Sequence, residues 1–362
     1  MLRKIALAVL VLVLAFVTYL LVKPPAPLPY HGNGELTRGI VYHQYGPPDV
    51  LHLESIEKSV PSANQILVKV HAAAVNPLDW HFIRGVPYIL RMQAGLRKPD
   101  DPRIGADMAG VVEAVGSAVT RFKAGDEVFG TAEDGAFAEY AVAAENKVAL
   151  KPASITFEQA AAVPVAAVTA LQGLRDKGQL RAGQKVLING ASGGVGTFAV
   201  QIAKSMGAEV TGVCSTRNLE LVRSIGADHV IDYTKEDFTL GTQRYDLIFD
   251  TVGNRPLSAV RRVMTPKGID IGIGGGGPSE SPWIGAFMGP IKGLVYSPFI
   301  SQRFTFFVSS ENSDDLSMLG RMMEEKKLTP VIDRTYKLDE VPTAIRYLEE
   351  GHARGKVVIS VD

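Results

Sequence analysis

The chain has 362 residues, 46% of them hydrophobic, and its 38 lysine and arginine side chains balance 38 aspartates and glutamates. This length is enough for two domains and a large core. A net charge of zero, with no basic run after the first few residues, argues against a nucleic-acid partner. The single cysteine, Cys214, has no partner for an intrachain disulfide, so we expect a small buried residue.

The N-terminal segment 5–22 carries no charged residue, follows Arg3 and Lys4, and precedes a proline-rich stretch at 24–29. A helix of this length spans about 27 Å, just enough for the hydrocarbon core of a bilayer. We predict an uncleaved transmembrane anchor and a stiff, extended spacer, which together form region 1–37. A cleaved signal peptide is the alternative, although its apolar part is usually shorter.

Residues 38–150 show short strand patterns with glycine and proline turns, and no long amphipathic helix. Between 68 and 74, apolar residues alternate with Lys69 and His71, as in a half-buried strand, and the pattern continues at 110–116. We therefore predict a β-rich domain over 38–161.

Strands and helices alternate only after Pro152. We expect strands at 186–189, 209–214, 229–233, 247–250 and 269–273, with helices such as 218–225 and 257–264 between them. This order is typical of an α/β fold, a Rossmann-type doubly wound parallel sheet, which we place at 162–300. The remaining residues, 301–362, are expected to return to the first domain and to end in a strand at 356–361.

A glycine-rich turn follows the first of these strands, with Gly190, Gly193 and Gly196 ahead of an amphipathic helix. Such glycines allow a tight turn, a close approach to a pyrophosphate and close packing of helix on strand. The helix N-terminus then offers free N–H groups to the phosphates. This context favours a dinucleotide site over an ordinary surface turn.

The end of the second strand selects between the two nicotinamide dinucleotides, because it meets the adenosine ribose. NAD requires an acid there, but this strand runs out into Ser215, Thr216 and Arg217. Hydroxyls and a guanidinium suit a 2′-phosphate better. We therefore expect NADP(H) as the cofactor, although Arg217 could also be a solvated charge.

Residues 283–300 are almost entirely apolar, with Lys292 as their only charge. One interpretation is a core helix or a dimer-contact helix. The other is an apolar lid or membrane-dipping surface beside the cleft, which would suit a lipophilic acceptor.

Motifs at 105–116, 122–130 and 190–196 occur in the order and at the spacing of the medium-chain dehydrogenase/reductase superfamily, which the chain resembles from residue 38 onward. The resemblance implies a GroES-like catalytic domain beside the Rossmann-type domain. Zinc enzymes of this superfamily carry a metal-binding cysteine in the segment that is 75–79 here, and Gly-His-Glu where this chain has Gly-Ala-Asp at 105–107. Both ligand residues are missing, so we expect no metal site and no catalytic zinc.

Within the superfamily, the chain resembles the zinc-free quinone oxidoreductases and enone reductases, and especially homologues of the reticulon-4-interacting oxidoreductase. The resemblance rests on the stretches 214–218, 227–233, 250–254 and 351–356. It implies a cofactor groove formed by Gly190, Ser192, Gly193, Gly194, Val195 and Gly196 at the pyrophosphate, Ser215, Arg217 and Tyr233 at the adenosine end, and Asn254, His352, Ala353 and Arg354 elsewhere. Alternatively, Tyr233 packs at its strand end and His352 interacts with a helix dipole.

The implied chemistry is hydride transfer from C4 of NADPH to a quinone or to the β-carbon of an enone, which needs orientation and charge stabilisation and no nucleophile. Asn76, at the metal-ligand position, is the candidate donor to the acceptor oxygen, with Asp79 orienting a neighbouring group. Thr169 is a candidate neighbour of the nicotinamide. The alternatives are an Asn-Pro turn for Asn76, and for Thr169 a bond back to its own helical turn.

We therefore predict a membrane-tethered, zinc-independent NADPH-dependent oxidoreductase with a small lipophilic acceptor and, as an option, a homodimeric assembly. The positive charges near Met1 favour export of the catalytic part, but the cofactor favours the NADPH-containing side, in the cytoplasm or an organelle interior. Two alternatives stay open. One is a membrane-tethered NADPH-binding scaffold without turnover, and the other is an enoyl-thioester reductase, which would need a basic groove for its carrier.

Overall fold

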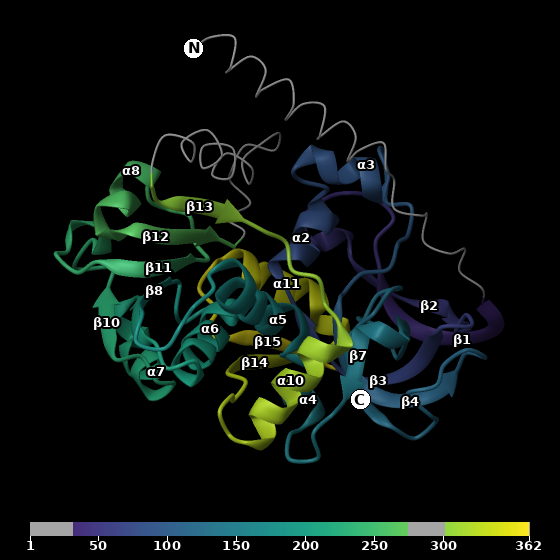
Figure 1. Ribbon diagram of the computed structural model, residues 1–362. Coiled ribbons are helices and arrows are strands. Elements are labelled where there is room, and N and C mark those ends of the chain that lie inside the picture. Colours follow the sequence, from purple (N-terminus) through teal and green to yellow (C-terminus); the bar gives the residue numbers. More distant parts are fainter. Residues whose placement is uncertain (1–31, 274–300, 362) are drawn as a thin grey trace, which may run out of the picture.

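The computed structural model describes residues 32–273 and 301–361. Figure 1 shows two units side by side, each built around its own large sheet. The chain builds most of the first unit, crosses to the second, and then returns to add two strands to the first sheet. The junction between the units is thus crossed more than once by the chain.

The first unit contains a mainly antiparallel sheet in the order β14-β15-β3-β4-β5-β7, with β6 also paired to β3, and a hairpin of β1 and β2. Its strands are β1 (Gly32–Val41), β2 (His52–Ser59), β3 (Gln65–Val75), β4 (Asp107–Val115), β5 (Glu127–Thr131), β6 (Tyr140–Ala144), β7 (Val148–Leu150), β14 (Ile332–Lys337) and β15 (Lys356–Ser360). Its helices are short: α2 (Pro77–Arg84), α3 (Arg91–Ala94), α4 (Phe157–Ala161) and α11 (Val341–Glu349).

The second unit is a fully parallel sheet in the order β10-β9-β8-β11-β12-β13, wound with helices. Its strands are β8 (Lys185–Asn189), β9 (Glu209–Cys214), β10 (His229–Asp232), β11 (Tyr245–Asp250), β12 (Met264–Gly272) and β13 (Arg303–Phe306), and the helices are α5 (Pro164–Gln172), α6 (Gly194–Ser205), α7 (Leu219–Ser224), α8 (Leu257–Val260) and α10 (Ser313–Glu324). Val186, Leu187 and Ile188 of β8 are all fully buried, as expected for a parallel strand covered on both faces.

One hydrophobic cluster is shared by the two units. Ala74 of β3 and Val358 of β15 belong to the same cluster of buried apolar side chains as Val186 of β8 and Phe198 of α6. Since this cluster spans the junction, the ends of β3 and β15 are held firmly beside the second sheet.

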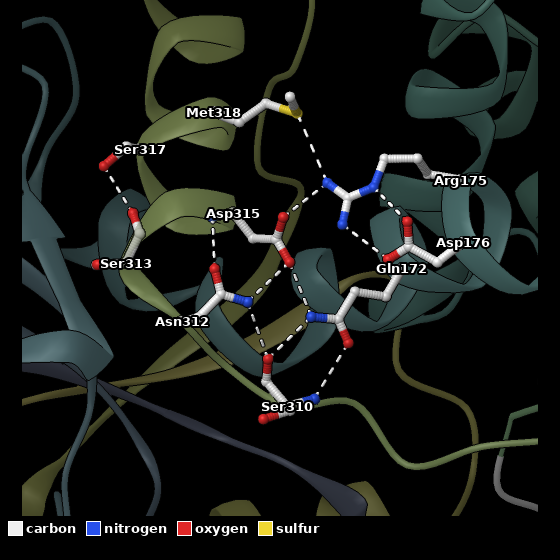
Figure 2. A network of polar contacts seen from close by, with 9 residues as sticks. All are labelled: Gln172, Arg175, Asp176, Ser310, Asn312, Ser313, Asp315, Ser317 and Met318. Carbon is white, nitrogen blue, oxygen red and sulfur yellow. Dashed lines mark hydrogen bonds and ion pairs between the residues drawn. The ribbon is translucent and has the colours of Figure 1, made fainter.

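A polar network docks the chain onto α5 where it returns from the second sheet, as Figure 2 shows. The Gln172 amide donates to the Ser310 carbonyl oxygen at 2.8 Å and accepts from the Ser310 N–H at 3.1 Å. Arg175 donates to Asp315 at 2.6 Å, and Asn312 accepts from the Asp315 N–H at the start of α10. Burial raises the pKa of Asp315, but the hydrogen bonds from Arg175, Gln172 and Asn312 outweigh it, so the pKa lies below its usual value.

No helix in the described ranges, 32–273 and 301–361, is long and apolar enough to cross a membrane. Helices α6 and α10 have 12 residues each, so each spans about 18 Å, whereas a bilayer core needs about 30 Å. This finding contradicts two predictions, namely the transmembrane helix in the predicted fold class and the membrane-anchored localisation. The predicted anchor at 5–22 and the predicted lid at 283–300 lie outside the described residues.

Asp270, in β12, is buried, and its Oδ1 atom has no hydrogen-bond partner among the described residues. Burial raises the pKa of this carboxyl well above its usual value, and the negative charge of Asp250 adds to the effect. When the folded-state pKa exceeds the unfolded one, stability falls as the pH rises past the unfolded value of about 3.9.

Asp270→Asn cannot ionise, so it is expected to raise the melting temperature, and by more at pH 8 than at pH 5. Thermal denaturation at both pH values measures this difference. Asp100→Asn, at an exposed position, is the control and should show no such pH dependence. An equal gain at both pH values, or a loss at pH 8, would mean that Asp270 is not a buried acid that costs stability.

Candidate active site

The glycine-rich turn joins β8 to α6 at the carboxyl end of the parallel sheet. Gly190 has a left-handed φ of +84°, and a Cβ atom on Gly196 would stand 2.1 Å from the Gly190 carbonyl oxygen. The first hydrogen bond of α6 runs from the Thr197 N–H to the Gly193 carbonyl oxygen, so the N–H groups of 194–196 have no acceptor within their helix. Three such N–H groups at a helix N-terminus suit a phosphate.

The loop before β15 lies beside this turn. Gly355 forms a parallel bridge with Gly193. Arg217, from the segment after β9, donates through Nη2 to the His352 carbonyl oxygen at 2.6 Å. The structure therefore brings the end of the chain to the glycine-rich turn and, with it, the predicted groove residues His352, Ala353 and Arg354.

The segment after β9 carries the exposed guanidinium of Arg217. The acid on the neighbouring strand is Asp232, but its carboxylate accepts from the Thr216 hydroxyl at 2.5 Å and from the Thr234 hydroxyl at 2.7 Å. The hydrogen bond from Thr216 lowers the pKa of Asp232 to about 2, with burial opposing it. This acid is thus engaged within the protein, while the Tyr233 side chain, 49% exposed, stands at the same edge of the sheet.

Asn218 connects the glycine-rich turn to the end of β9. Its Nδ2 atom donates to the Ser192 hydroxyl at 2.9 Å and to the Ser215 hydroxyl at 3.3 Å. Its Oδ1 atom is buried and has no hydrogen-bond partner among the described residues. A buried carbonyl oxygen left without a donor costs stability, so a ligand hydroxyl at this point would satisfy it.

Asn254 lies across the sheet from these residues, near the carboxyl ends of β8 and β11. Its Oδ1 atom is 3.4 Å from Nδ2 of Asn189, which also donates to Asp250 at 2.8 Å. Val195, in the first turn of α6, packs against the shared core. The predicted groove residues thus line the carboxyl edge of the sheet, and their contact with a dinucleotide stays a prediction.

A buried polar cluster, formed by Asn76, Asp107 and Lys356, lies where β3, β4 and β15 meet. The Lys356 ammonium donates to Asn76 Oδ1 at 2.6 Å and to Asp107 Oδ2 at 3.1 Å. Asn76 Nδ2 donates to Asp107 at 3.0 Å. A Cβ atom on Gly194 would lie 3.1 Å from Lys356 Cδ, so the lysine stem runs alongside the glycine-rich turn.

Asp79 lies in the first turn of α2, is 3% exposed and accepts from the Asn76 N–H at 2.7 Å. Burial raises the pKa of Asp79 to about 7, and the charge of Asp107 acts in the same direction. The Asn76 N–H and the Lys356 charge oppose this rise. Asp79 can therefore hold or release a proton near neutral pH.

Thr169 lies on α5 beside the cluster. Its Oγ1 atom is 2.7 Å from the Val165 carbonyl oxygen and 2.9 Å from Ser309 Oγ. The Val165 N–H donates to Asp107 at 2.9 Å. The Thr169 hydroxyl therefore bonds back to its own helical turn, which was the alternative interpretation, and its contact with a nicotinamide stays a prediction.

The positions that bind zinc in related enzymes hold groups that do not fit a catalytic zinc here. Ala106 has no donor atom, and the oxygens of Asn76 and Asp107 already face the ammonium of Lys356. A second cation on these atoms would be repelled by the first.

Three polar residues of the site, Asp107, Asn218 and Lys356, were not among the sequence-predicted site residues. Asp107 and Lys356 are each the first residue of a mostly apolar strand, where a charged residue usually marks the solvent-exposed end. Asp107 is 0% exposed and Lys356 is 3% exposed, and the sequence gives no sign of this burial. Asn218 offers no local signal beyond its place after a strand.

Two family models match the chain. Residues 62–153 match the model described as "Alcohol dehydrogenase GroES-like domain", and residues 225–359 match the one described as "Zinc-binding dehydrogenase". The two matches correspond to parts of both structural units.

The chain is also similar to characterised relatives over most of its length. The NADPH-dependent alkenal/one oxidoreductase, chloroplastic, of Arabidopsis thaliana is 38% identical, over 88% of this chain and 78% of its own. The mitochondrial NAD(P)H oxidoreductase RTN4IP1 of Homo sapiens is 35% identical, over 89% and 88%. The structure of the quinone oxidoreductase from Coxiella burnetii matches with a TM-score of 0.80 and 31% identity, over 91% of this chain and 100% of that one. The predicted resemblance is confirmed: this oxidoreductase belongs to the medium-chain dehydrogenase/reductase superfamily.

Proposed function

We propose that the protein uses NADPH to reduce a small lipophilic acceptor, either a quinone or an α,β-unsaturated carbonyl compound, by hydride transfer. The observation that carries this proposal is the position of Lys356, whose stem lies along Gly194 while its ammonium binds Asn76. One side chain thereby joins a dinucleotide-binding turn to a buried polar cluster. The alkenal/one oxidoreductase and the quinone oxidoreductase among the similar proteins support the same two acceptor classes.

The described residues fit NADPH along the carboxyl edge of the second sheet. The N–H groups of 194–196 suit the pyrophosphate, and Arg217 suits the 2′-phosphate, because Asp232, the acid on the strand beside the end of β9, is engaged by the Thr216 hydroxyl. The Oδ1 atom of Asn218, for which the described ranges offer no hydrogen-bond partner, suits a ribose hydroxyl. When bound, NADPH supplies the hydride from C4 of its nicotinamide.

The polar cluster suits an acceptor that becomes negatively charged. Asn76 Nδ2 has a second, longer hydrogen bond of 3.3 Å to the Ala74 carbonyl oxygen, and it can exchange this bond for one to the acceptor oxygen. The buried charge of Lys356 then stabilises the charge that develops there. Asp79, with its pKa at about 7, can hold the proton that completes the reduction.

The full-length chain is expected to oxidise NADPH when it is mixed with members of a panel of quinones and enones, and to do so faster than it oxidises NADH. The decrease in absorbance of the reduced dinucleotide measures both rates. Tight NADPH binding without turnover of any acceptor would favour the scaffold alternative. Binding of neither dinucleotide would overturn the cofactor assignment.

A further inference from the structure

Lys356 is one of the most deeply buried charged side chains of the described residues, at 3% exposure. Its ammonium has three N–H groups, and they donate to the Val75 carbonyl oxygen at 3.1 Å, to Asn76 Oδ1 at 2.6 Å and to Asp107 Oδ2 at 3.1 Å. A buried ammonium is stable only when it is paired and hydrogen-bonded in this way. All three N–H groups are used. All three of their hydrogen-bond acceptors lie on the side of the site where the proposed substrate would bind.

These contacts fix which way the Asn76 carboxamide points. An ammonium can only donate hydrogen bonds, so the amide atom next to Lys356 must be the oxygen. The NH₂ group then faces Asp107 Oδ2 at 3.0 Å and the Ala74 carbonyl oxygen at 3.3 Å. Without Lys356, the amide could rotate and present its oxygen to the acceptor, which would repel the developing charge.

The same side chain contacts the cofactor side. Lys356 begins β15 directly after Gly355, which is bridged to Gly193 in the glycine-rich turn. Its Cδ atom lies 3.1 Å from the Cβ position of Gly194. The position of the ammonium therefore depends on the turn, and the orientation of Asn76 depends on the ammonium.

We propose that Lys356 is a positioning residue of the reductase site, which orients the Asn76 amide toward the acceptor oxygen and keeps a positive charge beside it. This inference rests on the function proposed above. The alternative is a purely structural role, in which Lys356 only connects β15 to β3 and β4. The experiment has to distinguish this role from positioning of Asn76.

The two roles can be distinguished because the charge of Lys356 is paired with that of Asp107. Lys356→Met alone leaves Asp107 buried beside no ammonium, and breaking a buried pair in this way is strongly destabilising. The double variant Lys356→Met/Asp107→Asn removes both charges with little change in side-chain volume, and the new amide oxygen can still accept from the Val165 N–H. It should therefore recover part of the lost thermal stability.

The expected result for the double variant is a melting temperature above that of Lys356→Met, an NADPH dissociation constant changed only slightly, and a kcat lowered by about 10²-fold with little change in KM for the acceptor. Thermal denaturation, NADPH fluorescence titration and steady-state kinetics give the three readouts. The matched control is Lys151→Met/Glu127→Gln, because the Lys151 side chain is only 5% exposed, contacts the half-exposed Glu127 at 2.9 Å and lies outside the site. The control should leave kcat unchanged.

A double variant that regains wild-type kcat together with its stability would overturn the inference, because the role of Lys356 would then be structural. A parallel loss of NADPH affinity and kcat would also overturn it, since the lysine would then act through cofactor binding. Failure of the proposed function gives a different result, in which the wild-type chain itself reduces no acceptor although it binds NADPH.

Discussion

Gly196→Ala is expected to abolish measurable NADPH binding and to lower the stability of the fold. The added Cβ atom would stand 2.1 Å from the Gly190 carbonyl oxygen and 2.9 Å from Ala191 Cα. Both of these are backbone atoms, so no side chain can rotate away. Either α6 or the turn has to move, and overpacking of this kind costs about 1–3 kcal/mol or more.

The movement has a functional consequence, because the N–H groups of 194–196 belong to the part of α6 that shifts. A phosphate held by several N–H groups depends on their common geometry. Titration of NADPH by fluorescence and thermal denaturation measure the two effects.

The matched control is Gly320→Ala, a glycine inside α10 whose added Cβ atom would meet its nearest neighbour, Pro152 Cγ, at an ordinary 3.6 Å. Alanine favours helix formation over glycine by about 1 kcal/mol. The control should therefore keep NADPH binding and be as stable as the wild-type chain, or slightly more stable. Unchanged NADPH affinity in Gly196→Ala would show that the dinucleotide does not bind at this turn.

The glycine-rich turn and its flanking elements could be predicted from the sequence because their physical causes are local. A buried apolar strand, left-handed or tightly packed glycines and an amphipathic helix follow one another within a few residues. The second strand was predicted at 209–214, and β9 spans Glu209–Cys214. Cys214 was expected to be a small buried residue and is 1% exposed, and burial raises the pKa of its thiol to about 11.

One boundary was wrong because strand pairing overrode a helical pattern. A helix was predicted at 257–264 and a strand at 269–273. Helix α8 and the 3-10 helix Arg261–Val263 cover all but the last residue of the predicted helix, whereas β12 already begins at Met264. The buried residues Val260, Val263 and Met264 have a spacing that suits a helix face. Met264 nevertheless pairs with Tyr245 of β11, a contact that no local pattern reveals.

The polar cluster could be predicted only in part. Asn76 was singled out by its position in a family motif, but the hydrogen bond between Lys356 and Asn76 joins residues 280 positions apart. Neither periodicity nor composition carries information over such a separation. Only the antiparallel pairing of β15 with β3, in which Val357 stands opposite Val75, places the lysine at the cluster.

Arg217→Ala is expected to lower kcat/KM for NADPH by about tenfold to 100-fold while leaving kcat/KM for NADH nearly unchanged. A charge-assisted hydrogen bond to a phosphate is worth about 1.5–3 kcal/mol, and each 1.36 kcal/mol corresponds to a factor of about ten. Only NADPH carries the 2′-phosphate, so only its rate depends on this bond. Arg217 is exposed, which places the expected effect toward the lower end of the range.

Adding Ser215→Asp to Arg217→Ala is expected to reverse the preference, because the acid would stand at the end of β9, where it can accept from the ribose hydroxyls of NADH. Asp232 cannot take this role in the present chain, since Thr216 and Thr234 occupy its oxygens.

Arg223→Ala is the matched control, because this nearby arginine is paired with Glu220 on α7 at 2.7 Å, and its loss should leave the ratio of the two rates unchanged. Equal losses with NADPH and NADH in Arg217→Ala would mean that Arg217 acts through its hydrogen bond to the His352 carbonyl oxygen, holding the groove together. The selectivity for NADPH would then have to come from another group.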